Sequence, residues 1–219
     1  MGRAEILVEV ISHYGLREQY MELVKEAAMN TKLDQVNADD GERYTSLAIA
    51  LHWIVALLII GMLILGYYMA DLPKGTPDRA FYFNLHKSFG VLAGALILLR
   101  LGWRMTHPAP FMTASAPHWT DKAAWWTHRL LYLCMVVQPL SGYLSSSFNK
   151  YGVKFFGVAL PNWGWQDDNL RDFFMNIHNL ISVVLIALIL VHVLAAFKHL
   201  LWDRDDVFQR MLPRRSKTQ

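Results

Sequence analysis

The sequence is poor in cysteine and, over long stretches, contains no charge. Its 219 residues include a single cysteine, Cys134. This excludes an internal disulfide, a cysteine-bound iron–sulfur cluster and the Cys-x-x-Cys-His attachment of a covalent haem. Charged residues make up only 18% of the chain, and the formal net charge is +3. We expect no nucleic-acid partner.

Charge is almost absent from four apolar segments. Leu47 to Ala70, Leu130 to Phe148 and Phe173 to Phe197 contain no formally charged residue, and Phe83 to Trp103 contains only one lysine and one arginine, each near an end. A helix that crosses a hydrocarbon core ~30 Å thick needs about 20 mostly apolar residues. Four soluble core helices this long and this free of charge would be unusual. We therefore predict an all-α fold, a transmembrane four-helix bundle in the lipid bilayer.

The basic residues between these segments predict an orientation. One side would hold Arg43, Arg100, Arg104, Lys122, Arg129, Lys198, Arg204, Arg210, Arg214, Arg215 and Lys217. The other would hold Lys74, Arg79, Lys87, Lys150, Lys154 and Arg171. Because the richer side is normally cytoplasmic, we expect a multi-pass protein of the bacterial inner membrane with both termini inside. No cleavable signal peptide is expected, since the N-terminal region is long and charged.

The first 43 residues differ from the rest, with nine acidic and five basic residues. Apolar residues at helical spacing predict an amphipathic helix over residues 4–29, followed by a polar linker, Asn30 to Glu42. Met29 offers an alternative start, so residues 1–28 remain open as a misassigned beginning of the gene. The expected organisation is an extension (1–43), a membrane domain (44–213) and a basic tail (214–219).

Two histidines of the last apolar segment, His178 and His192, stand fourteen residues apart. Fourteen helical steps return to nearly the same face and climb ~21 Å. The two rings would therefore lie near opposite sides of the bilayer, where histidine is costly and marks a functional site. By depth, His52 pairs with His192 near the inner face, and His86 pairs with His178 near the outer face.

Two histidines at each of two depths suit two haems better than one metal ion with four protein ligands. We therefore predict two noncovalent b-type haems, with axial ligands His52/His192 and His86/His178. Gly90 and Gly94 follow His86 on its own helix face. They predict either close approach of a flat macrocycle or ordinary packing of small residues between helices.

Two further histidines lie near the inner face. His128, near the inner end of the third apolar segment, could bind a quinone headgroup or a haem propionate, or simply occupy the membrane interface. His199 lies seven residues after His192. Pairing it with His178 would require a span of about 31 Å, too deep into the interface, so we interpret it as an interface residue.

Several motifs in order resemble one family, the bacterial dihaem cytochrome b561 group of four-helix inner-membrane proteins of the superoxide oxidase type. The motifs are Ala50-Leu-His-Trp53, His86-Lys-Ser-Phe-Gly90, Arg100-Leu-Gly-Trp-Arg104, His128-Arg-Leu-Leu-Tyr132, His192 to His199 and Arg210-Met-Leu-Pro213. The resemblance covers about residues 44–213, and it implies haem ligands at the same four histidines. It implies nothing for residues 1–43.

The expected function is one-electron transfer through the two haems, coupled to the quinone pool through ubiquinone. The outer cations could focus a small anion toward the outer haem. The resemblance makes superoxide the leading candidate, and it makes a superoxide:ubiquinone oxidoreductase the leading activity. Lys87 is the candidate catalytic residue because it directly follows His86. The alternatives are a cytochrome b subunit that anchors a hydrogenase or formate dehydrogenase, and a transporter that uses its histidines as proton relays.

Overall fold

The computed structural model describes residues 16–108 and 118–213. The chain divides into two units that meet in the sequence between Arg43 and Tyr44. The described part of the first unit is one helix, α2, from Leu16 to Glu42. Its apolar side chains, such as Tyr20 and Leu23, are exposed.

Helix α2 differs from the expected extension in its extent. The first part of the predicted amphipathic helix lies outside the described residues. The segment predicted to be a polar linker, Asn30 to Glu42, instead continues the helix. Its composition allows this, since it contains no proline and its single glycine, Gly41, stands next to the end of the helix.

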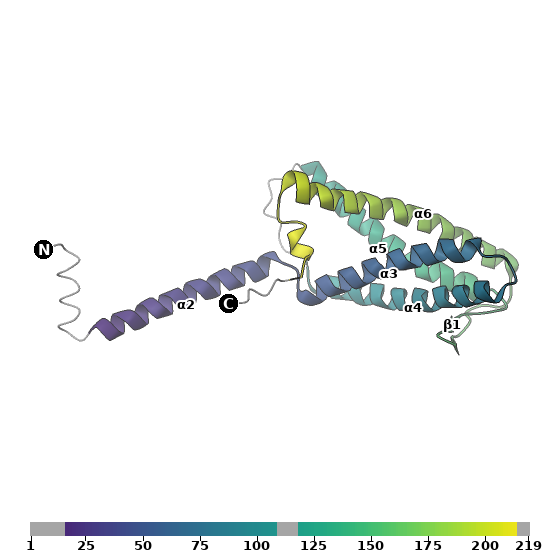
Figure 1. The fold of residues 1–219 in the computed structure, drawn as a ribbon, viewed down its shortest axis with the longest axis horizontal. Coiled ribbons are helices and arrows are strands. Elements are labelled where there is room, and N and C mark those ends of the chain that lie inside the picture. The colour runs from purple at the N-terminus through teal and green to yellow at the C-terminus, as the bar shows by residue number, and fades with distance from the viewer. Residues whose placement is uncertain (1–15, 109–117, 214–219) are drawn as a thin grey trace. The chain divides into compact units, whose positions relative to one another are not determined.

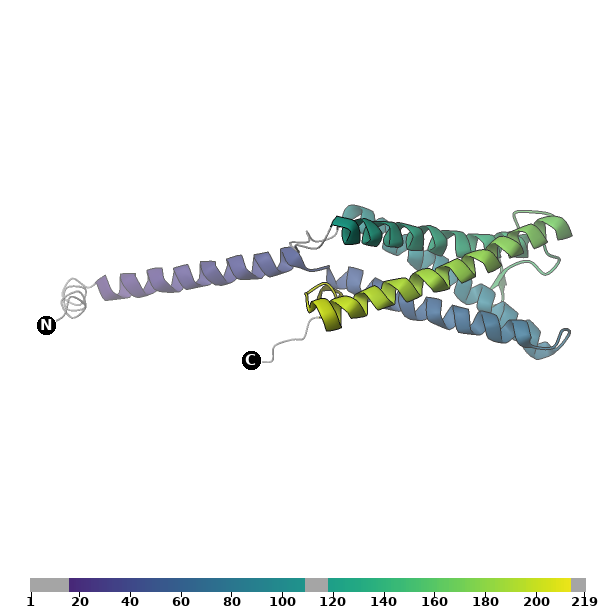
Figure 2. The ribbon, with the colours of Figure 1, turned by 90° about the horizontal axis from the view of Figure 1, so that it is seen from above.

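The second unit contains four long helices: α3 (Ser46–Asp71), α4 (Pro77–Thr106), α5 (His118–Ser147) and α6 (Asp168–Lys198). They lie side by side as two hairpins, α3 with α4 and α5 with α6, and α4 contacts α5 (Figures 1 and 2). Helices α3, α4 and α6 each contain one of the predicted apolar segments, and α5 contains the remaining one except for its last residue, Phe148. The prediction of an all-α bundle is therefore confirmed.

Four short elements accompany these helices in the described residues. A two-stranded hairpin, β1 (Lys154–Phe155) and β2 (Val158–Ala159), lies in the connection between α5 and α6 and packs on α4. Helix α6 continues into a π-helical turn, η1 (His199–Asp203), and a 3-10 turn, η2 (Gln209–Met211), follows it.

Three of the four long helices begin at side chains suited to cap them. The hydroxyl of Thr45 accepts a hydrogen bond from the Ala48 amide at 3.3 Å, and Thr76 caps α4 in the same way. The carboxylate of Asp167 accepts from the Leu170 amide at 3.0 Å. Each cap satisfies an amide that the first helical turn leaves without a partner.

The bundle has a small buried core and a wide apolar exterior. The core contains Val55, Ile59, Ala93, Ile97, Leu131, Cys134 and Leu185. Large side chains such as Leu57, Ile64 and Leu180, each more than 60% exposed, cover the outside of the helices. An apolar surface this extensive would be unfavourable in water and suits contact with lipid.

By length and composition, three helices can cross a membrane: α3, α4, and α6 together with η1. Helix α5 has the same length as α4, 30 residues, but Gln138, Pro139 and several serines interrupt its apolar segment. Its crossing remains a prediction. Helix α5 lies against α4 at Pro139, where a Cβ on Gly94 would stand 3.3 Å from the proline ring.

Candidate functional site

The helices bring the four predicted histidines together as two pairs. His52 of α3 and His192 of α6 have ring centroids 6.2 Å apart, and we call them the first pair. His86 of α4 and His178 of α6 have ring centroids 6.3 Å apart, and we call them the second pair. Helix α6 thus supplies one ring to each pair, at two levels of the bundle.

The ring separations suit a metal ion held between each pair. A metal bonded to one nitrogen of each ring at about 2 Å leaves the two ring centroids roughly 6 Å apart. Both pairs have this separation, and among the described residues neither pair belongs to a group of three or more histidine, cysteine or carboxylate side chains close enough to hold a metal ion as a structural zinc site does. A macrocycle that supplies the remaining ligands fits this donor set.

The contacts of the second pair suit ring nitrogens that bind a metal ion. Nδ1 of His178 donates to the Gln138 carbonyl at 2.9 Å, so in the neutral ring the lone pair lies on Nε2. Metal-binding histidines typically fix their other nitrogen in this way. Nδ1 of His86 is buried and has no hydrogen-bond partner among the described residues. A polar atom left so is costly unless a bound group satisfies it.

Two glycines lie against the rings of the second pair. A Cβ on Gly66 of α3 would stand 3.3 Å from Cε1 of His86, and a Cβ on Gly142 of α5 would stand 3.0 Å from Cε1 of His178. Only the absence of side chains there leaves the rings uncrowded. The sequence analysis pointed instead to Gly90 and Gly94, where a Cβ would stand 3.6 Å from Met62 and 3.3 Å from Pro139 respectively. The helix-packing interpretation of these two glycines is the one that the contacts support.

The first pair has a more polar environment. Nη2 of Arg100 lies 3.2 Å from Nδ1 of His52, and Nη1 donates to the Ala48 carbonyl at 3.0 Å. The ring of His128 lies edge-on to His192 with centroids 5.2 Å apart, and its Nδ1 donates to the Ala124 carbonyl at 2.7 Å. His128 is thus a neighbour of the first pair.

The sequence analysis assigned no place beside the histidine pairs to Gly66, Arg100 or Gly142, although these residues follow a rule that it had used only for α6. On α3, Gly66 lies fourteen residues after His52; on α4, Arg100 lies fourteen after His86; on α5, Gly142 lies fourteen after His128. Every helix therefore presents two residues on one face, at the levels of the two pairs. The same spacing, applied to all four helices, would have pointed to these residues.

The ammonium group of Lys87, the predicted catalytic residue, contacts the loop between α5 and α6. Its Nζ donates to the Gly152 carbonyl at 2.8 Å, and the side chain is half-buried. The neighbouring Ser88 is buried, and its hydroxyl accepts from the Phe156 amide at 2.9 Å. Both residues thus attach this loop to α4, beside the second pair.

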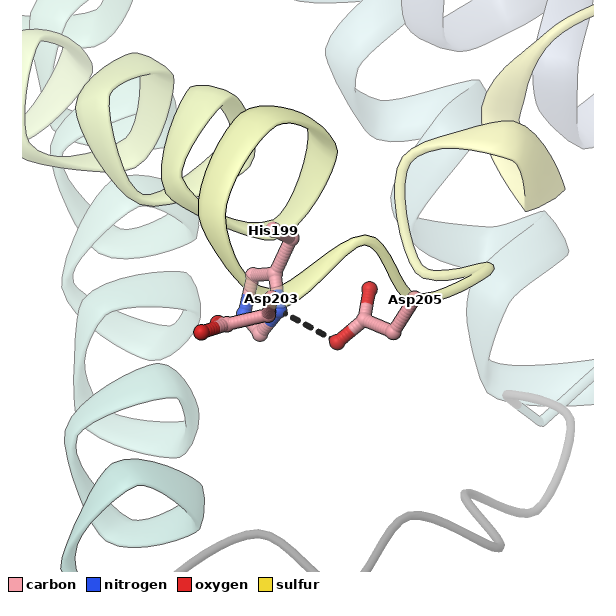
Figure 3. Close-up of side chains that lie close together, drawn as sticks. All are labelled: His199, Asp203 and Asp205. Carbon is pink, nitrogen blue, oxygen red and sulfur yellow. Dashed lines mark hydrogen bonds and ion pairs between the residues drawn. The ribbon is translucent and has the colours of Figure 1, made fainter.

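His199 lies apart from both pairs, in an ion-pair cluster at the end of α6 (Figure 3). Its Nδ1 lies 2.7 Å from a carboxylate oxygen of Asp205 and 3.3 Å from one of Asp203. The same Asp203 oxygen accepts from Nζ of Lys198 at 2.5 Å. The lysine ammonium and the histidine ring thus both contact carboxylates of this cluster.

Comparison with known proteins gives matches over the second unit. A family profile, prokaryotic cytochrome b561, matches residues 43–214. Cytochrome b561 homolog 2 of Escherichia coli K12 is 32% identical over 182 residues, covering 80% of this chain and 94% of that protein. Cytochrome b561 homolog 1 of the same strain is 27% identical over 177 residues, 79% of this chain and 98% of that protein. A probable superoxide oxidase CybB of Yersinia pestis is 24% identical over 177 residues, 80% of this chain and 98% of that protein.

Proposed function

The chain belongs to the prokaryotic cytochrome b561 family, and from this membership we propose that it conducts electrons from superoxide to ubiquinone through two b-type haems. Transmembrane electron transfer and a b-type haem come with the family. The number of haems, their ligands and the two reaction partners belong to the proposal.

The two histidine pairs are the observation that carries the proposal. His52 and His192 would hold one haem, and His86 and His178 the other, with ring separations of 6.2 and 6.3 Å. When bound, haem iron would supply the one-electron chemistry, and the protein would supply the histidines that hold it, its position and the local dielectric. Gly66 and Gly142 keep space beside the second pair, and the Gln138 carbonyl fixes the proton of His178 on Nδ1.

The reaction balances as two one-electron steps for each quinone. Superoxide loses one electron and leaves as dioxygen. Two such electrons and two protons convert ubiquinone to ubiquinol. The quinone would arrive sideways from the bilayer, near the first pair, because apolar side chains of α3 and α6 such as Ile54 and Leu194 are exposed there.

The cations near the second pair support an anionic electron donor. Lys87, Lys74 and Lys154 lie at the end of the bundle where α4 and α6 begin, and a cluster of like charge attracts a small anion. Arg171 adds less to this field than its charge suggests, because it forms ion pairs with Asp168 and Asp172. The name of the Yersinia pestis relative adds independent support for superoxide.

The orientation belongs to the same proposal. The end of the bundle with fewer lysine and arginine residues would face the periplasm, and both termini would lie in the cytoplasm of a bacterial inner membrane. Superoxide would then react outside, at the second pair, and electrons would move inward to the first pair.

Haem stoichiometry in histidine variants tests the proposal. The purified wild-type chain should hold two haems, measured as the pyridine haemochrome per chain. His52→Ala or His192→Ala should lose the first-pair haem and His86→Ala or His178→Ala the second, leaving at most one. His199→Ala is the matched control on the same helix end and should keep both. Two haems in His192→Ala would reject the assignment. Stable co-purification with a large redox enzyme would favour the role of a cytochrome b subunit instead.

A further inference from the structure

The two histidine pairs offer the same axial groups but differ in the charge around them. Each pair consists of two imidazoles, so ligand identity alone gives the two sites no difference in reduction potential. The remaining influences are hydrogen bonds, burial and nearby charge. The two pairs in this bundle differ in the charge that lies near their rings.

At the level of the first pair, α4 places a guanidinium group beside the ring of His52. Nη2 of Arg100 lies 3.2 Å from Nδ1 of His52. The bond from Nη1 to the Ala48 carbonyl, 3.0 Å long, anchors the group independently of the ring. Arg100 is half-buried, and no carboxylate lies within ion-pair distance of it among the side chains that the structure describes.

At the level of the second pair, the contacts of the rings are neutral. The ring of His178 contacts the backbone carbonyl and the side-chain amide of Gln138, and the hydroxyl of Ser141. Gly66 and Gly142 provide no side chain. Within residues 16–108 and 118–213, no charged side chain hydrogen-bonds to either ring of this pair, and Lys87 directs its ammonium to the Gly152 carbonyl.

We propose that Arg100 sets the direction of electron flow by raising the reduction potential at the first pair above that at the second. This inference rests on the proposed function, in which each pair holds one haem. A nearby positive charge stabilises the state that carries one additional electron, and the effect is large where the dielectric is low. An electron that enters at the second pair is then favoured to move to the first pair, with no proton or other reactant required.

Redox titration of the purified, haem-loaded full chain tests this role. The wild-type chain should titrate in two resolved steps. In Arg100→Gln the step of higher potential should move to lower potential while the other stays, so that the two steps approach each other. His86→Ala, which keeps only the first-pair haem under the proposed ligation, should retain the higher step.

Two charge variants provide the controls. Arg100→Lys keeps the positive charge and should keep the two steps apart. Arg104 lies one turn further along α4 and packs on the Tyr44 ring, 5.0 Å from its centroid, so Arg104→Gln should leave both steps unchanged.

Three results would overturn the inference while leaving the proposed function intact. They are an unchanged higher step in Arg100→Gln with both haems bound, a shift of the lower step instead, and collapse of the separation in Arg100→Lys. If Arg100→Gln fails to retain haem, the separation of the two redox steps in Arg100→Lys becomes the deciding measurement. A wild-type chain without haem would reject the proposed function itself.

Discussion

A ring nitrogen can bind a metal only if the face and edges of its ring remain uncrowded. In the second pair this space depends on glycine, because helices α3 and α5 approach the two rings closely. Gly142 is the tighter position, since its missing Cβ would stand 3.0 Å from both Cε1 and Nδ1 of His178. The hydrogen bond from His178 to Gln138 holds the ring in place and limits its retreat.

We predict that Gly142→Ala loses the second-pair haem while the protein still inserts and folds. The added methyl must displace the His178 ring, and a metal–nitrogen bond tolerates only small displacements. The purified variant should bind about half the wild-type haem, measured as the pyridine haemochrome and by the amplitude of the reduced-minus-oxidised spectrum.

Gly61→Ala is the matched control. A Cβ on Gly61 of α3 would meet nothing within 4 Å, so the same change in helix propensity should leave haem content unchanged. Full haem content in Gly142→Ala would mean that the ring can move aside and that this glycine is not needed for binding.

Among the elements, the connection between α5 and α6 is attached to the side of α4. Ser88, only 3% exposed, accepts from the Phe156 amide, and Lys87 donates to the Gly152 carbonyl. Phe156 has a positive φ of 46°, which costs energy for a residue other than glycine. The contact with Ser88 therefore holds a backbone that would otherwise relax.

We predict that Ser88→Ala loosens this loop by about 1 kcal/mol, the typical net value of one buried hydrogen bond. The Phe156 amide would lose its acceptor. Hydrogen exchange of residues 152–160 should accelerate roughly fivefold, while the centres of the four helices stay protected. The control is Ser182→Ala, whose hydroxyl donates only to the Asn179 carbonyl of its own helix. Equal exchange in both variants would show that other contacts hold the loop.

The four helices of the bundle could be predicted because long uncharged segments have few alternative structures. The division of His52, His86, His178 and His192 into two pairs followed from the rise of a helix per residue. The contacts of Gly66, Gly142 and Arg100 depend on the rotation of each helix about its axis, which the packing of four helices sets jointly. The extent of α2 was also missed, because a segment rich in aspartate and asparagine looks like a linker in composition, although without proline it continues the helix.

At the scale of the whole molecule, the distribution of charge bears on both orientation and substrate. The end of the bundle near the second pair carries few basic residues, but several of them are not balanced by carboxylates in the described ion pairs. Nζ of Lys87 donates to the Gly152 carbonyl of the loop beside α4. Lys154 lies in the same loop, and its backbone carbonyl accepts a hydrogen bond from the Ser88 hydroxyl. Under the proposed function, we expect a small anion to approach this end by electrostatic attraction.

We predict that reduction of the haems by superoxide is a charge-steered encounter in which Lys87 takes part. In right-side-out membrane vesicles, superoxide generated outside should reduce the haems at a rate that falls as salt rises. The reach of the field shortens from ~10 Å at 0.1 M to about 3 Å at 1 M ionic strength. Lys87→Gln should slow this reaction severalfold at low salt and approach the wild-type rate at high salt.

The controls separate steering from damage to the site. Lys87→Arg keeps the charge and should react at nearly the wild-type rate, whereas reduction by quinol, a neutral donor, should be unaffected in all three proteins. Equal slowing with superoxide and quinol would mean that Lys87 acts on the haem site through the Gly152 loop contact. Reaction only in inside-out vesicles would reverse the proposed orientation. A superoxide rate independent of salt in the wild-type chain would leave the family's electron transfer in place and remove superoxide as its donor.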